Sequence, residues 1–177
     1  MHSIEDGQST IESSRGDRAQ PQAKPKKRFN VLFLCPNNAI HSVMAEALLR
    51  RWGGDNFRAF SAGTEPTGVI DRRALEILRQ QRVWHPALPS KGHLEFLGPE
   101  APRMDFVISL GERAPAGAPK EWPGNPQVIH WRITNPSLAG KPAEIAHAFR
   151  KAFGELETRI RLFVLVYEKE AMKQAAA

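Results

Sequence analysis

Four short apolar runs alternate with amphipathic or polar stretches along the chain. The first, Phe29–Cys35, is almost continuously apolar and rich in β-forming residues, a pattern typical of a strand buried on both faces of a parallel sheet. Further strands are predicted at 57–63, 104–110 and 127–131. Because strands alternate with helical segments, we expect an α/β fold with a four-stranded parallel sheet, right-handed crossovers and helices on both faces.

The stretches between the strands predict helices. Ser42 can cap a helix over 43–52, and Asp71 is predicted to cap one that includes 74–78. A short helix is expected over 90–97.

A long helix is predicted from Pro142 onward. Its apolar residues recur at spacings of three and four and form one stripe, which we expect to pack into the core rather than to receive a partner: Ile145, Phe149, Phe153, Leu156, Ile160 and Phe163.

The predicted domain covers residues 29–170. Residues 1–28 are polar and contain few large apolar side chains, so we expect a disordered basic and polar tail, and we expect 171–177 to be a frayed C-terminus. The net charge of +6 favours anionic partners. The run Lys24–Arg28 is interpreted as a solvated tail rather than a nucleic-acid patch, so nucleic-acid binding is not expected.

The length of 177 residues, with 41% hydrophobic and 25% charged residues, is ordinary for one globular domain. No apolar run is long enough to span a bilayer, and the polar N-terminus does not resemble a signal segment, so we expect no membrane association and a cytoplasmic location. The single cysteine excludes an internal disulfide framework and an all-cysteine zinc site.

That cysteine ends the first predicted strand and opens the segment Cys35-Pro36-Asn37-Asn38-Ala39-Ile40-His41-Ser42. A tight loop between a strand and a helix directs several backbone N–H groups inward, which predicts an oxyanion site formed by residues 37–42. A thiol at that point gains hydrogen bonds and dipole stabilisation in its charged form, and Ser42 can donate one further bond. The alternative interpretation is a buried structural cysteine.

The surroundings of this loop resemble the low-molecular-weight protein tyrosine phosphatase superfamily, and within it the phosphatase-like bacterial arsenate reductases. The resemblance runs from about Phe29 to Tyr167 and rests on these segments: 31–35, Asn38, Ser42, 44–48, 57–64, 96–99, 104–108, 122–124 and Trp131. It implies a flavodoxin-like three-layer sandwich, a nucleophilic Cys35 and arsenate, phosphate or a phosphorylated ligand as the bound anion. No cofactor and no metal are implied.

Three positions depart from the family pattern. His41 stands where the family has an arginine, and an imidazole makes one contact where a guanidinium makes two. We expect His41 to titrate near neutrality and to bind anions better as the pH falls. Asn135 replaces the acidic residue before Pro136 and cannot supply a proton. Gly111 stands where thioredoxin-coupled reductases have a relay cysteine, so a reductase route needs an external thiol reductant or a thiol-donor protein.

The loop interior differs as well. Pro36 removes one backbone donor, Ile40 is bulkier than the usual alanine, and Asn37 replaces a glycine, which is tolerable if its φ is positive.

Two functions remain open at this point. The first is an enzyme in which Cys35 attacks the oxyanion, His41 weakly replaces the arginine, and Asn135 orients the leaving group or water. The second is a pseudoenzyme that keeps the fold and binds an anion, a phosphoprotein or a regulatory partner.

The other polar residues are expected to have structural rather than catalytic roles, or stay unplaced. Surface or core roles are expected for the histidines His85, His93, His130 and His147, and a turn or capping role for Asp105. Glu65 and Arg132 could lie near the loop mouth.

Overall fold

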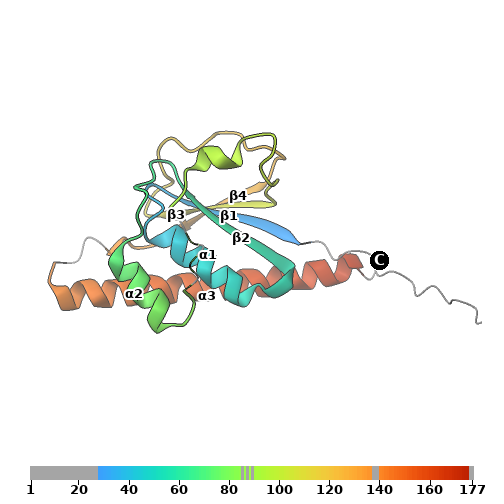
Figure 1. The fold of residues 1–177 in the computed structure, drawn as a ribbon. Coiled ribbons are helices and arrows are strands. Elements are labelled where there is room, and N and C mark those ends of the chain that lie inside the picture. The colour runs from blue at the N-terminus through green and yellow to red at the C-terminus, as the bar shows by residue number, and fades with distance from the viewer. Residues whose placement is uncertain (1–27, 85, 87, 89, 137–139, 176–177) are drawn as a thin grey trace, which may run out of the picture.

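The computed structural model describes residues 28–84, 86, 88, 90–136 and 140–175. Four parallel strands form one sheet in the order β2-β1-β3-β4 (Figure 1). The central strands are β1 (Phe29–Cys35) and β3 (Phe106–Gly111), and the edges are β2 (Phe57–Gly63) and β4 (Gln127–Arg132). The predicted parallel sheet is confirmed.

The third strand begins later than predicted because Asp105 is occupied in joining β3 to β1. Its carboxylate accepts a hydrogen bond from the N–H of Asn30 at 2.8 Å, and its own N–H donates to the Asn30 carbonyl at 2.9 Å. Asp105 therefore ties the start of β3 to β1, and the turn or capping role expected for it stays a prediction.

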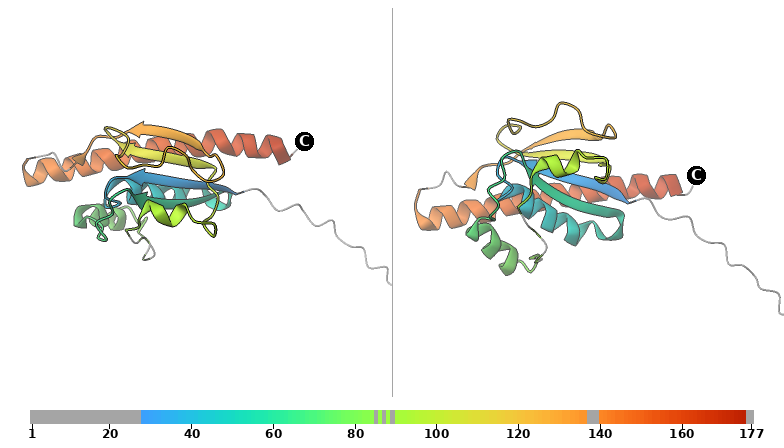
Figure 2. Two further views of the ribbon diagram at one scale, coloured as in Figure 1. Left: turned by 90° about the horizontal axis from the view of Figure 1, so that it is seen from above. Right: turned by 45° about the horizontal axis from the view of Figure 1, so that its top comes forward.

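The two faces of the sheet are covered differently (Figures 1 and 2). One face carries α1 (His41–Trp52), α2 (Arg72–Gln80) and α3 (Pro142–Ala175). The other carries the 3-10 helix η2 (His93–Phe96) and the β3–β4 connection, so the short helix expected over 90–97 is reduced to this turn. A second 3-10 turn, η1 (Gly54–Asn56), joins α1 to β2.

Each face has its own hydrophobic core. The larger core joins the helices to the inward residues of the sheet, and the predicted stripe of α3 supplies much of it: Phe149, Phe153, Leu156, Ile160 and Phe163 are buried, and Ile145 is half-buried. The smaller core packs Phe96 of η2 and Trp122 against Leu32, Leu34 and Val107. Burial on both faces explains why β1 is apolar at nearly every position.

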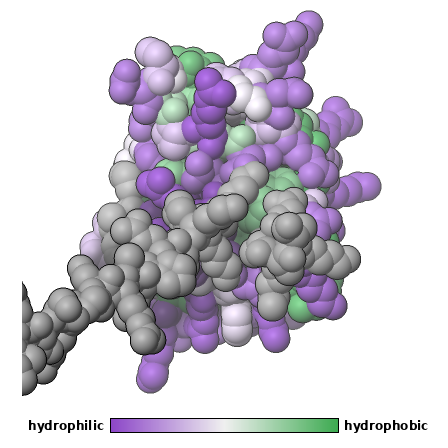
Figure 3. Space-filling model, turned by 90° about the vertical axis from the view of Figure 1, so that its right-hand side faces the viewer, coloured by the Kyte–Doolittle hydropathy of each residue, from purple (hydrophilic) through white to green (hydrophobic). Residues whose placement is uncertain are grey.

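The structure describes only part of the two chain ends. The predicted tail lies outside the described residues apart from Arg28, whose guanidinium pairs with Asp55 at 2.9 Å. α3 continues to Ala175, beyond residue 170 where we expected the domain to end. Figure 3 shows that the described surface around this end of the molecule is mostly hydrophilic, with small hydrophobic patches. Within the described ranges, no helix is both long and apolar enough to cross a membrane.

Candidate active site

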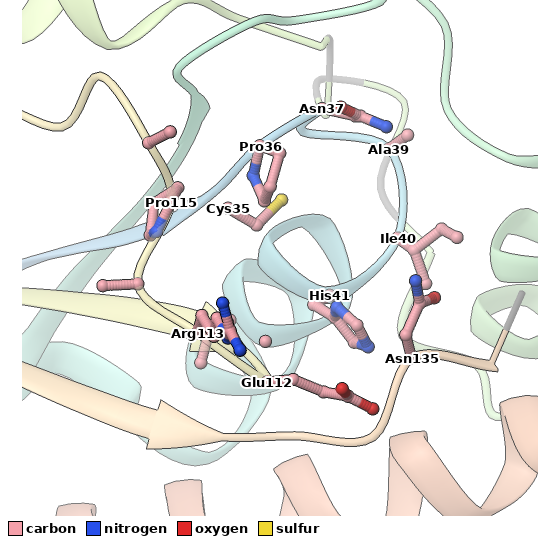
Figure 4. A pocket seen from close by; sticks show the side chains of 14 residues that line it. Cys35, Pro36, Asn37, Ala39, Ile40, His41, Glu112, Arg113, Pro115 and Asn135 are labelled. Carbon is pink, nitrogen blue, oxygen red and sulfur yellow. The ribbon is translucent and has the colours of Figure 1, made fainter. Parts of the chain in front are cut away.

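The loop between β1 and α1 borders a cavity of about 400 Å³ at the carboxyl ends of β1 and β3 (Figure 4). Ligands in open parallel sheets bind at this edge, so the position agrees with the sequence argument. The cavity is lined by three parts of the chain: Cys35, Pro36, Asn37, Ala39, Ile40 and His41 from the loop and the start of α1; Leu110–Ala116 from the end of β3 and the connection after it; and Asn135.

Four carbonyl groups of the loop accept hydrogen bonds from the neighbouring β2–α2 connection. N–H groups of this connection donate to them: Thr64 to Cys35 at 3.2 Å, Glu65 to Pro36 at 2.8 Å, Thr67 to Asn37 at 3.2 Å, and Asp71 to Ala39 at 3.0 Å. The N–H groups of residues 37–40 donate to no acceptor in the described part of the chain, and those at the start of α1 have no partner within the helix. These donors could serve an anion, and anion binding by residues 37–42 stays a prediction.

The end of β2 packs directly beneath this loop. A side chain at Gly63 would place its Cβ 2.6 Å from the Pro36 carbonyl oxygen and 2.9 Å from the Asn38 nitrogen. Gly63 therefore lets the loop backbone approach the sheet more closely than any other residue would permit.

The thiol of Cys35 lies within a buried polar cluster. Its Sγ is 3.0 Å from the Ser42 Oγ, and the Asn38 Nδ2 donates to that same hydroxyl at 2.8 Å. The Ser42 hydrogen is thereby free to point at the sulfur. Since Asn38 Oδ1 accepts from the Lys91 N–H at 2.6 Å, Asn38 ties the cluster to the chain before η2.

One local prediction for this loop is wrong. Ser42 does not cap α1, because the helix already begins at His41 after Ile40 and the Ser42 hydroxyl is used by Cys35 and Asn38. The positive φ of the loop lies at Asn38, at 46°. Asparagine tolerates this left-handed conformation better than most residues, which suits Asn38 to the bend of the loop.

The predicted cap of α2 is confirmed: the Asp71 carboxylate accepts from the Arg73 N–H at 2.8 Å.

The fully buried carboxylate of Glu46 is linked to this polar cluster through Lys91. Glu46 accepts hydrogen bonds from Arg50 at 2.6 Å, from the Ser61 hydroxyl at 2.5 Å, and from Lys91 at 3.4 Å. A buried charge is tolerated only when it is paired and hydrogen-bonded, and Glu46 meets that condition. Lys91 thus contacts both this carboxylate and the loop asparagine.

His41 lines the cavity, but its ring is buried and one of its nitrogens is already engaged. Only 7% of the residue is exposed, and its Nε2 lies 3.1 Å from the Thr134 carbonyl oxygen. Because a carbonyl can only accept, Nε2 carries the hydrogen. Burial lowers the pKa of His41 below its ordinary value; the Thr134 hydrogen bond and the Glu155 charge oppose this only in part. The structure therefore shifts the titration of His41 to lower pH than we expected from the sequence and favours the neutral ring at pH 7.

The two other positions that differ from the family pattern, Asn135 and Gly111, also line the cavity. Asn135 lines it beside His41 and Ile40 (Figure 4). Gly111 ends β3 with a φ of 130°, a conformation that glycine adopts and other residues avoid. Any side chain at this position would therefore be strained.

Two charged cavity residues were not identified in the sequence. Glu112 and Arg113 directly follow β3, and the same edge argument that selected Cys35 after β1 could have found them. The two charged residues that were suggested instead, Glu65 and Arg132, are not among those that line the cavity.

The histidines have ordinary surroundings. His93 lies 3.2 Å from the Gly63 carbonyl, His130 lies 2.9 Å from the Ser109 hydroxyl, and His147 is exposed, while His85 is outside the described residues. Among the described side chains, no group of three or more potential ligands is placed to hold a metal ion.

Comparison with known proteins supplies a family. Residues 30–175 match the family described as low molecular weight phosphotyrosine protein phosphatase. The sequence is 29% identical over 134 residues to an arsenate reductase of Halalkalibacterium halodurans, covering 75% of this chain and 93% of the relative. It is 28% identical over 138 residues to an arsenate reductase of Bacillus cereus, covering 78% and 96%.

Solved structures share the fold. An arsenate reductase from Archaeoglobus fulgidus superposes with a TM-score of 0.60 at 24% identity, covering 76% of this chain and 98% of that one. A low molecular weight phosphotyrosine phosphatase from Vibrio cholerae gives 0.57 at 23%, covering 80% and 97%. A structure described as an arsenate reductase in the phosphate binding state gives 0.64 at 21%, covering 77% and 97%.

Proposed function

Because the chain belongs to the low molecular weight phosphotyrosine protein phosphatase family, we propose that its loop 35–42 binds a tetrahedral oxyanion and that Cys35 is the nucleophile that attacks it. The observation that carries this proposal is the orientation of the loop. Four of its carbonyls accept from the β2–α2 connection, and the N–H groups of residues 37–40, next to the Cys35 thiol, have no acceptor within the described chain. Backbone donors fixed in this way stabilise an anion at little cost in reorganisation.

Two kinds of relative support the choice of anion. Curated relatives that are named arsenate reductases are matched over most of their length, and one structure of the same fold is described in a phosphate binding state. Arsenate and phosphate have the same shape and charge, so one loop can accept either.

With arsenate, Cys35 would form a sulfur–arsenic bond as one arsenate oxygen leaves as water. An external thiol would then attack the Cys35 sulfur, giving a mixed disulfide and releasing arsenite. A second thiol would reduce the disulfide, so that two thiols supply the two electrons. The external thiols are needed because the chain has one cysteine. The proposal agrees with a reducing compartment such as the cytoplasm.

With a phosphate monoester, the thiolate would form a sulfur–phosphorus bond while the ester oxygen leaves, and water would later release phosphate. Asn135 lines the cavity but has no proton to give the leaving group. Loss of a general acid costs about 10²–10⁴ in rate, so only esters with good leaving groups, such as aryl phosphates, would react measurably.

The second candidate is an anion-binding protein without turnover. It is favoured by the neutral, buried ring of His41, because the loop then lacks the cation that stabilises charge in the transition state. The two candidates share the binding loop and differ in the fate of the bound anion.

Alkylation of Cys35 by iodoacetamide, followed by mass spectrometry, tests the shared part. The single cysteine makes the site of modification unambiguous. Arsenate or phosphate should slow alkylation of the folded protein in a saturable manner, whereas chloride at equal ionic strength should not. Equal rates with and without the oxyanion would refute the proposed site. Single-turnover release of p-nitrophenol from its phosphate, and arsenite formation with added dithiothreitol, then distinguish the enzyme from the binding protein.

A further inference from the structure

We propose that Arg113, on the connection after β3, supplies the cation that holds the oxyanion beside Cys35, in the place of a guanidinium on the loop itself. This assignment rests on the proposed function, since it names a further binding residue for the same anion. It makes the site a composite of two strand ends, with backbone donors from one and the charged side chain from the other.

Sheet topology brings the two strand ends together. β1 and β3 are hydrogen-bonded parallel neighbours, with Leu34 paired with Ser109, so the residues that follow them leave the sheet at the same edge. Cys35 and Arg113 accordingly line one cavity. Figure 4 shows Arg113 on the wall opposite Ile40 and Asn135, across the hollow that the loop encloses.

The charge of Arg113 is available. Its side chain is exposed, and its guanidinium makes no hydrogen bond or ion pair with the rest of the chain that the structure describes. Two other cations near the loop are already engaged: Lys91 with Glu46, and Arg73 with Asp71 at 2.8 Å.

The cavity otherwise lacks positive charge. Among its lining residues, only Arg113 and Glu112 carry a fixed charge, and the buried His41 ring is neutral. Figure 4 shows the Glu112 carboxylate turned toward His41 and Asn135, away from Cys35, so it does not neutralise the approach to the thiol.

A guanidinium suits this task chemically. Its planar fork contacts two oxygens of a tetrahedral anion at once, and it stays charged at every physiological pH. Arsenate binding should consequently show no loss between pH 6 and 8 that can be traced to deprotonation of a protein cation, in contrast to a site built on a histidine.

The test compares Arg113→Gln with Lys120→Gln in the full chain. Lys120 lies on the same β3–β4 connection, is exposed, and is not among the residues that line the cavity, so its substitution removes the same charge from the same segment. Arsenate affinity is measured by isothermal titration and by protection of Cys35 from iodoacetamide, an uncharged reagent, at constant pH and ionic strength. Circular dichroism confirms that each variant is folded.

We expect Arg113→Gln to weaken arsenate binding about tenfold or more, which is the effect of losing a charge-assisted hydrogen bond. Lys120→Gln should remain within about twofold of the unmodified protein, and Arg113→Lys should be intermediate because it keeps the charge but loses the fork. Equal affinities for the two glutamine variants, with clear binding to the unmodified protein, would overturn the assignment of Arg113 and leave the proposed function standing. No arsenate binding to the unmodified protein would overturn both.

Discussion

Replacing Gly63 by alanine tests how closely the anion loop depends on the end of β2. The new Cβ would lie 2.6 Å from the Pro36 carbonyl oxygen, and an ordinary contact begins at 3.4 Å, so the loop must withdraw by about 0.8 Å. The Pro36 carbonyl is also held by the Glu65 N–H at 2.8 Å, and this bond would be strained by the withdrawal. Overpacking of this kind costs about 1–3 kcal/mol, and a donor displaced by about 1 Å can lower the rate of a positioned reaction about 10²-fold.

The matched control is Gly92→Ala. Gly92 is bridged to Gly63, yet a Cβ there meets only a Pro66 side-chain carbon at 3.6 Å. Thermal unfolding should show a melting temperature lowered by about 4–8 °C for Gly63→Ala, the shift expected for about 2 kcal/mol in a chain of this length, and little change for Gly92→Ala. Protection of Cys35 by arsenate should be lost only in the first variant. A Gly63→Ala protein that melts and binds arsenate like its control would refute the argument that this contact fixes the loop.

Three further outcomes follow from the site. Because burial lowers the pKa of His41, the unfolded chain binds a proton below about pH 6.5 that the folded chain does not bind. The free energy of unfolding, measured in urea, should therefore fall from pH 7 to pH 5. The variant His41→Gln should reduce the slope of that fall by at most about 1.4 kcal/mol per pH unit. Lys91→Met should destabilise the fold by about 1–3 kcal/mol in the same assay, and adding Glu46→Gln should recover part of the loss; a double variant no better than the single one would contradict the pairing. His41→Arg with Asn135→Asp should raise hydrolysis of p-nitrophenyl phosphate by about 10²-fold or more, and no gain over the unmodified protein would mean that the loop geometry does not support catalysis.

The sheet and the long helix were predictable because their signals are periodic and strong. β1 is apolar at nearly every position since both of its faces are buried, and the stripe of α3 follows the helical repeat over many turns. The cap at Asp71 was also predictable, because its carboxylate bonds a donor two residues away, at Arg73. Such local interactions depend on few other residues.

The chemistry of the loop was less predictable because it depends on partners far away in the sequence. Ser42 was expected to cap α1, yet its hydroxyl is engaged by Cys35 and Asn38. The lowered pKa of His41 results from burial, which a hydrogen bond to the Thr134 carbonyl opposes only in part, and no short-range pattern reveals either of them. The family resemblance does not point to Arg113, because the cation that the resemblance implies belongs to the loop itself, whereas Arg113 lines the cavity from the connection after β3.

The backbone of Gly111 has a consequence for anyone who wishes to convert this protein into a self-contained redox relay. At a φ of 130°, any side chain incurs a strain of about 1–3 kcal/mol, so a thiol placed there would enter a segment that resists it. To build such a relay, the turn after β3 must be remodelled before a second cysteine is introduced. A single exchange of Gly111 for cysteine should yield a less stable protein in which Cys35 still depends on thiols from solution.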